Sequence, residues 1–99
     1  MTQQVWDEGI RSVNEFLSMI KEHPRTGSST QASKLLVSAI FGEGNFSLNR
    51  MSNFDLQNCE HALNILKAIC YHAADFRTAV AKAHAKQFTQ IRKELAQCA

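Results

Sequence analysis

From Asn45 to Ala99 the chain has neither glycine nor proline, and this run is more than half of its 99 residues. In a helix interior a glycine costs about 1 kcal/mol and a proline about 3 kcal/mol relative to alanine, so their absence favours helix. Apolar side chains recur through the run at spacings of mostly three and four. The first series is Leu56, Cys59, Leu63, Leu66, Cys70 and Ala73, and the second is Val80, Phe88, Ile91 and Leu95. This period predicts one very long helix or two helices joined by a bend.

The two series differ in phase, and the change falls just beyond Tyr71. We therefore expect a bend near residues 72–75. The open alternative is an unbroken helix over residues 53–97, which would be about 65–70 Å long at about 1.5 Å per residue. A monomer of this size cannot cover such a rod, so an unbroken helix would require a second copy.

The first half of the chain predicts two shorter helices. The first, over residues 4–22, has one apolar face and is ended by Pro24, because the residue before a proline is disfavoured in helical geometry. Its face consists of Trp6, Ile10, Val13, Leu17 and Ile20. The second begins at a serine N-cap, Ser28 or Ser29, and ends near Phe41 before Gly42, which suits the left-handed C-terminal position.

Between Gly42 and the long run lies a segment that we expect to be extended or a single helical turn. Ser52 with Asp55 three residues later resembles a capping box, which predicts the start of the third helix near residue 53. The predicted fold is therefore all-α, a three- or four-helix small domain with a long amphipathic C-terminal helix. It forms one domain over residues 1–99, in which residues 1–72 are the core and residues 73–99 form a basic amphipathic helix that serves as a dimerisation arm.

Composition argues against several classes of protein. The net charge of +2 is no signature of nucleic-acid binding by itself. No apolar run approaches the roughly 18–20 residues of a membrane span, and the first residues lack a secretion signal. Three widely spaced cysteines indicate reduced thiols, with Cys59 and Cys70 as small core residues. We therefore expect a cytoplasmic protein with no membrane partner.

The stretch from Val13 to Ile69 combines four recognisable features. They are an amphipathic helix ending in a Thr26-Gly27-Ser28 turn, a helix around Leu35-Leu36, the segment Gly44-Asn45-Phe46-Ser47-Leu48, and Asp55 leading into a helix with Leu63, Ile65 and Leu66. In this combination the stretch resembles an uncharacterised family of small helical domains from proteobacteria and their phages and plasmids. The resemblance implies a small helical fold encoded by a phage or mobile element. It carries over no activity, because none of the shared positions is catalytic in the family.

No constellation in the sequence predicts catalysis or metal binding. Cys59 with His61, and Cys70 with His72, are two residues apart, and such pairs point to different sides of a helix. No nucleophile elbow, phosphate-binding loop or dinucleotide fingerprint is present. With few loops there is little from which to build a preorganised pocket. We therefore expect no enzyme activity, no cofactor, no metal and no small-molecule substrate.

The basic amphipathic segment at the C-terminus is the best functional candidate. Residues 76–99 carry five basic residues against Glu94, a net charge of +4. We expect its apolar side to bind a protein partner, most simply as a homodimer, which makes the chain a non-enzymatic interaction or regulatory module. This predicted association face is Phe76, Val80, His84, Phe88, Ile91 and Leu95.

Two other interpretations of the same segment remain open. Its basic side could bind phosphates, which would make the chain a nucleic-acid-binding accessory protein. The residues for that alternative are Lys82, Lys86, Arg92 and Lys93. The lysines could also simply solvate the outer face of a packed helix, in which case they bind nothing.

Overall fold

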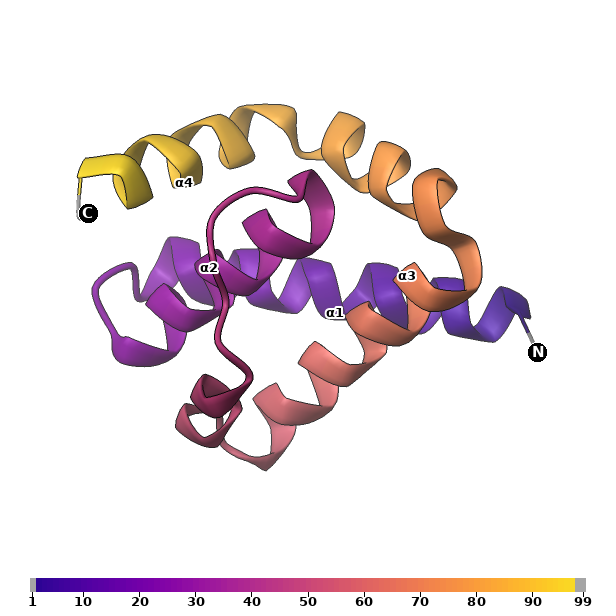
Figure 1. Ribbon diagram of the computed structural model, residues 1–99, viewed down its shortest axis with the longest axis horizontal. Helices are drawn as coiled ribbons and strands as arrows, with labels where there is room; N and C mark the ends of the chain where they lie inside the picture. The colour runs from indigo at the N-terminus through magenta and orange to yellow at the C-terminus, as the bar shows by residue number, and fades with distance from the viewer. Residues whose placement is uncertain (1, 98–99) are drawn as a thin grey trace.

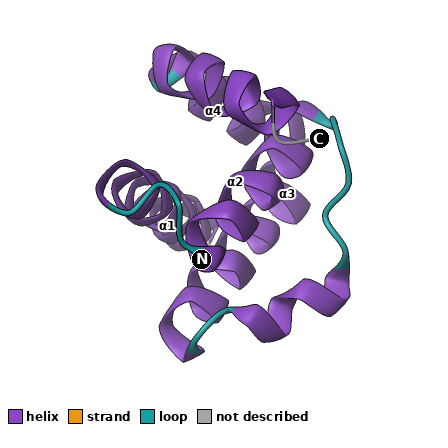
Figure 2. Ribbon diagram, turned by 90° about the vertical axis from the view of Figure 1, so that its left-hand side faces the viewer, coloured by secondary structure: helices purple, strands orange, loops and turns teal. Residues whose placement is uncertain are grey.

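In the residues that the structure describes, the long glycine-free run forms a short 3₁₀ helix and then two α-helices, the first of which has a sharp bend. In the computed structural model, which describes residues 2–97, the order of elements is α1 (Thr2–Glu22), α2 (Gly27–Phe41), the 3₁₀ helix η1 (Leu48–Asn53), α3 (Leu56–Ala83) and α4 (Ala85–Gln97). Those residues contain no strand, and short loops join the helices (Figure 2). The all-α prediction is confirmed, with a compact domain of four main helices.

The bend lies at Ala73, whose φ of 44° and ψ of −121° interrupt the helical geometry of α3. This confirms the bend expected near residues 72–75. A second break at His84, with φ −125° and ψ 29°, separates α3 from α4 and was not predicted. Because of the two breaks the described chain measures only 38 Å in its longest dimension, about half the length of the straight alternative.

Beyond the bend the chain lies alongside α1, and the two segments run in the same direction (Figure 1). Trp6 contacts Phe76 edge-on with ring centroids 5.4 Å apart. Further along, the Gln87 side-chain amide donates to the Leu17 carbonyl at 2.9 Å. Residues 73–97 therefore pack onto the rest of the domain and do not project as an arm.

The helix ends follow capping chemistry, with small shifts from the predicted positions. Thr26, not Ser28 or Ser29, caps α2, because its hydroxyl accepts from the Ser29 N–H at 3.2 Å. Gly42 has φ 66°, the left-handed geometry expected of it. Asp55 itself caps α3 by accepting from the Asn58 N–H at 2.7 Å, whereas Ser52 lies inside η1.

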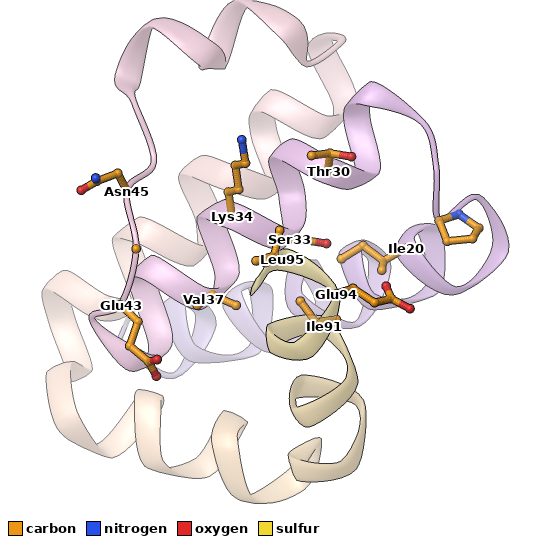
Figure 3. Close-up of a pocket in the computed structure, with 12 residues that line it drawn as sticks. Ile20, Thr30, Ser33, Lys34, Val37, Glu43, Asn45, Ile91, Glu94 and Leu95 are labelled. Carbon is orange, nitrogen blue, oxygen red and sulfur yellow. The ribbon is translucent and has the colours of Figure 1, made fainter. Parts of the chain in front are cut away.

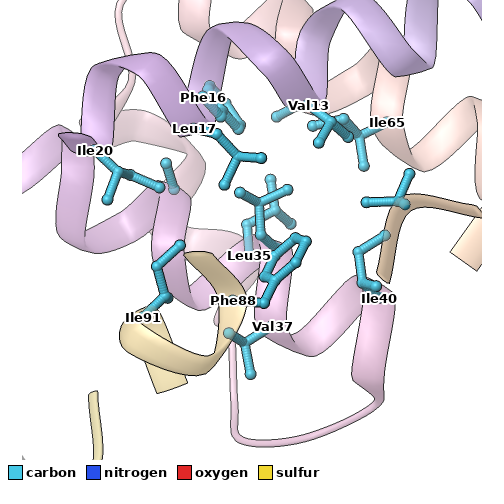
Figure 4. Packing of buried hydrophobic residues seen from close by; sticks show 14 of the residues in the cluster. Val13, Phe16, Leu17, Ile20, Leu35, Val37, Ile40, Ile65, Phe88 and Ile91 are labelled. Carbon is cyan, nitrogen blue, oxygen red and sulfur yellow. The ribbon is translucent and has the colours of Figure 1, made fainter. Parts of the chain in front are cut away.

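All four α-helices contribute to one core (Figure 4). Phe54, the residue that follows η1, also belongs to it. Its largest fully buried side chains include Phe16, Leu36, Ile65, Phe76 and Phe88. The last two lie beyond the bend. The C-terminal segment is therefore part of the core, which does not end at residue 72.

The core-facing side of α3 is not the side that carries most of the leucine and cysteine series. The structure buries Ala62, Ile65 and Ala68, whereas Leu63 is 51% exposed and Leu56 is 79% exposed. At 100° per residue, Leu63 and Ile65 lie about 160° apart around the helix. The exposed members of the leucine and cysteine series therefore lie on the side of α3 that faces away from the core.

The reason is the close approach of α1 to α3. A Cβ atom built on Gly9 would lie 2.5 Å from the Ala68 Cβ and 3.0 Å from the Phe76 ring. Helices that meet this closely need small residues on both sides, so the alanine face of α3 turns toward α1. The larger leucines are left on the outside.

Candidate interaction surfaces

Most of the predicted association face is inside the chain's own core. Phe76, Val80, Phe88 and Ile91 are 0%, 1%, 1% and 3% exposed. A buried side chain offers no surface to a partner, so these four residues do not form an exposed association face. The physical reason is the pair of breaks at Ala73 and His84, which turn the apolar side of the segment onto α1 and α2.

The two remaining residues of that face are half-buried. His84 sits at the break between α3 and α4, with its ring 6.5 Å from the Phe88 ring, edge-on. Leu95 packs against the edge of the core and lines a groove described below. Neither residue alone makes a surface large enough for a protein partner.

Of the four basic residues of the nucleic-acid alternative, three are exposed lysines, and the fourth, Arg92, contacts neighbouring elements. Lys82, Lys86 and Lys93 are exposed on the outside of the C-terminal segment. Arg92, by contrast, pairs with Glu43, and its guanidinium lies over the Phe41 ring, 4.6 Å from the centroid. Arg92 therefore fastens α4 to the C-terminal end of α2, which gives it a role in packing.

A part-buried polar cluster between α1 and α3 was not predicted from the sequence. The Ser12 hydroxyl lies 2.8 Å from His61 Nδ1 and accepts from the Asn64 side-chain amide at 3.1 Å. The arrangement fits a serine that donates to an unprotonated Nδ1. Ser12 is 0% exposed, so no substrate can reach its oxygen, and the cluster serves to join the two helices. No local signal reveals it, because Ser12 and its partners are 49 and 52 residues apart.

The thiols and imidazoles do not gather at one place. Cys59 is half-buried and Cys70 is exposed, which corrects the prediction that both are core residues, and Cys98 lies outside the described residues. Within residues 2–97 there is no group of three or more His, Cys, Asp or Glu side chains that could hold a metal ion. None of the helices in that range is long and apolar enough to cross a membrane.

A groove of about 450 Å³ lies beside α4, between α2 and the end of α1 (Figure 3). Ile20, Val37, Ile91 and Leu95 form its apolar part, and Lys34 is among the polar residues that line it. A second groove, which shares Ile20 and Ile91, follows the other side of α4. The two grooves show that α4 covers this end of the core incompletely.

An apolar line with exposed members runs along the outer side of α3. We call it the α3 line; its residues are Leu56, Cys59, Leu63, Leu66 and Cys70. Leu56, Leu63 and Cys70 are exposed, and the two others are half-buried at its inner edge. Two exposed charged residues, Glu60 and Lys67, flank the line on its outer side. An apolar line with charged flanks is typical of a helix that packs against another helix.

Comparisons with protein-family models, with curated proteins and with solved structures find no match to this chain. The resemblance to the family of small helical domains therefore stays a prediction from the sequence.

Proposed function

We propose that this chain is a small non-enzymatic interaction module that binds another protein, or a second copy of itself, through the α3 line. The observation that carries the proposal is the exposure of Leu56 at 79% and Leu63 at 51%, seven residues apart on one helix face. The proposal moves the predicted binding surface from the C-terminal segment to α3, because the apolar side of that segment is already covered.

Exposed leucines are common, and a single one needs no explanation. What distinguishes the α3 line is its spacing of three, four, three and four, which keeps five apolar residues on one stripe over nearly four turns. A partner helix or groove that covered this stripe would remove apolar surface from water, at about 25 cal/mol per Å². Helix-in-groove recognition uses anchors at this spacing.

The biological role that fits such a module is regulation by occupation of the partner's surface. The resemblance to domains of phages and plasmids supports a setting in which a small mobile-element protein binds a protein of its host. Binding through one helix face needs no cofactor and no chemical step.

The experiment compares three tagged forms of the full chain as baits in extracts of the native host, followed by mass spectrometry. They are the wild type, Leu63→Glu on the α3 line, and the matched control Lys21→Glu on the exposed side of α1. We expect specific partners, including the chain itself, with the wild type and with the control, and their loss with Leu63→Glu. Identical partners for all three folded forms would refute the proposal.

A second candidate function, nucleic-acid binding, has one observation in its favour. In the described part of the chain the only ion pair is Arg92 with Glu43, so the exposed Lys82, Lys86 and Lys93 have no acidic partner. Binding through these lysines would weaken with salt, because each phosphate contact releases counterions. Retention of DNA or RNA at low salt that falls in the variant Lys86→Glu/Lys93→Glu would support this function. No retention at low salt would refute it.

A further inference from the structure

We infer that the occupant of the α3 line is a second copy of this chain, packed antiparallel to form a two-fold dimer. The inference rests on the proposed function, in which the α3 line is a protein-binding surface. It goes further by naming the partner, its direction and the pairs of residues that meet.

The spacing of the line sets the register. In the heptad of a coiled coil, Leu56, Leu63 and Cys70 take one of the two core positions, and Cys59 and Leu66 take the other. When two copies run antiparallel, residues of the first set face residues of the second. Leu63 then meets Leu66 of the second copy, and Cys59 meets Cys70 of the second copy. The same line thus supplies both members of these layers, as a two-fold interface requires. Leu56 meets Ala73 of the second copy, at the bend.

The charges beside the line select the antiparallel direction. Glu60 and Lys67 are both exposed and lie on the same flank, seven residues apart. In the antiparallel register Glu60 of each copy faces Lys67 of the other, which forms two ion pairs between opposite charges. A parallel pair would instead place Asp55 beside Glu60 of the other copy, and like charges repel.

The position of the core leaves room for this partner. The buried Ile65 lies about 160° around the helix from Leu63, so the two domains would lie on the far sides of the helix pair. The straight part of α3 before Ala73 is about 25 Å long at about 1.5 Å per residue. A contact this short belongs to the small, weak class of interfaces, so we expect a dissociation constant in the micromolar range.

The test is a charge-reversal cycle on the full chain, read as the dissociation constant from sedimentation equilibrium. The variants are Glu60→Lys, Lys67→Glu and the double variant, with Lys21→Glu, on the exposed side of α1, as the control. Each single reversal turns both ion pairs into repulsions, and we expect it to raise the dissociation constant about tenfold. The double variant restores opposite charges and should return to within about threefold of the wild type. The two single variants change the net charge in opposite directions, so a general charge effect cannot weaken both.

The register has its own test with a short thiol-reactive cross-linker, in a Cys98→Ser background. Cross-linked dimer should form when Cys59 and Cys70 are both present. The cross-linked dimer should disappear when either cysteine is changed to serine, because the remaining cysteine would then face a serine of the second copy.

A wild type that stays monomeric through the high micromolar range would overturn the second-copy inference. Leu63-dependent capture of another protein would in that case still support the proposed function. A dimer whose dissociation constant is unchanged by Leu63→Glu and by both charge reversals would likewise overturn the second-copy inference. Loss of both self-association and Leu63-dependent capture would refute the inference and the proposed function together.

Discussion

Gly9 is the position where adding one methyl group should most clearly test the packing of this fold. The substitution Gly9→Ala would place a Cβ atom 2.5 Å from the Ala68 Cβ and 3.0 Å from two atoms of the Phe76 ring. Both neighbours are 0% exposed. The Ala68 Cβ is fixed to the α3 backbone and cannot rotate away, so α1 and α3 would have to move apart.

Two opposing effects decide how much Gly9→Ala changes the free energy of unfolding. Alanine favours helix over glycine by about 1 kcal/mol, which would stabilise α1. Overpacking a well-packed core costs about 1–3 kcal/mol, and the contact here is close enough for the upper part of that range. We therefore expect Gly9→Ala to lower the free energy of unfolding by about 1–2 kcal/mol, which corresponds to a fall in Tm of about 4–16 °C.

The assay is urea and thermal unfolding followed by circular dichroism. The matched control is Gly27→Ala, because a Cβ there would meet no atom within 4 Å, and we expect that change to be neutral or slightly stabilising. In a double-mutant cycle, Ala68→Gly should cost less in the Gly9→Ala background than in the wild type, since it removes the clashing atom. If Gly9→Ala proves as stable as the wild type or more so, the close approach of α1 to α3 is refuted.

Three further predictions concern the free energy of unfolding of the purified chain, measured by chemical denaturation. Ala73→Gly should raise this free energy by about 1 kcal/mol, because φ of 44° is costly for any residue with a Cβ. The neighbouring control Ala74→Gly should lower the free energy by about 1 kcal/mol. Equal effects of the two changes would contradict the bend. Ser12→Ala should lower the free energy of unfolding by about 1–3 kcal/mol, since it leaves the buried side of His61 without its hydrogen bond, and a neutral result would contradict the cluster. Phe88→Ala should lower it by about 3–5 kcal/mol, and a loss below about 1 kcal/mol would show that α4 is not part of the core.

Much of the secondary structure was predictable, because its signals are local. Pro24 and Gly42 end their helices through their own backbone preferences, and the absence of glycine and proline after Asn45 predicts helix whatever surrounds it. The change of phase beyond Tyr71 predicted the bend that the structure places at Ala73. The break at His84 was not predictable, because no glycine, proline or strong cap stands there.

The functional surface was harder to predict, because burial depends on distant parts of the chain. The amphipathic pattern of residues 76–95 correctly indicates an apolar side that must be covered. It does not say whether another protein or the same chain covers it. The bend at Ala73 decides the matter by turning Phe76 and Phe88 onto the chain's own helices.

By itself the sequence determined that this protein is helical, where most helices begin and end, and that the long run must bend or find a partner. Those properties follow from backbone preferences and from the spacing of apolar residues. Only the tertiary structure decided which side of α3 is buried. The spacing of the leucines gives α3 one apolar side, but the contact of α3 with Gly9 of α1 is too close for leucine side chains. Ala62 and Ala68 are therefore buried, and Leu56 and Leu63 are exposed to water.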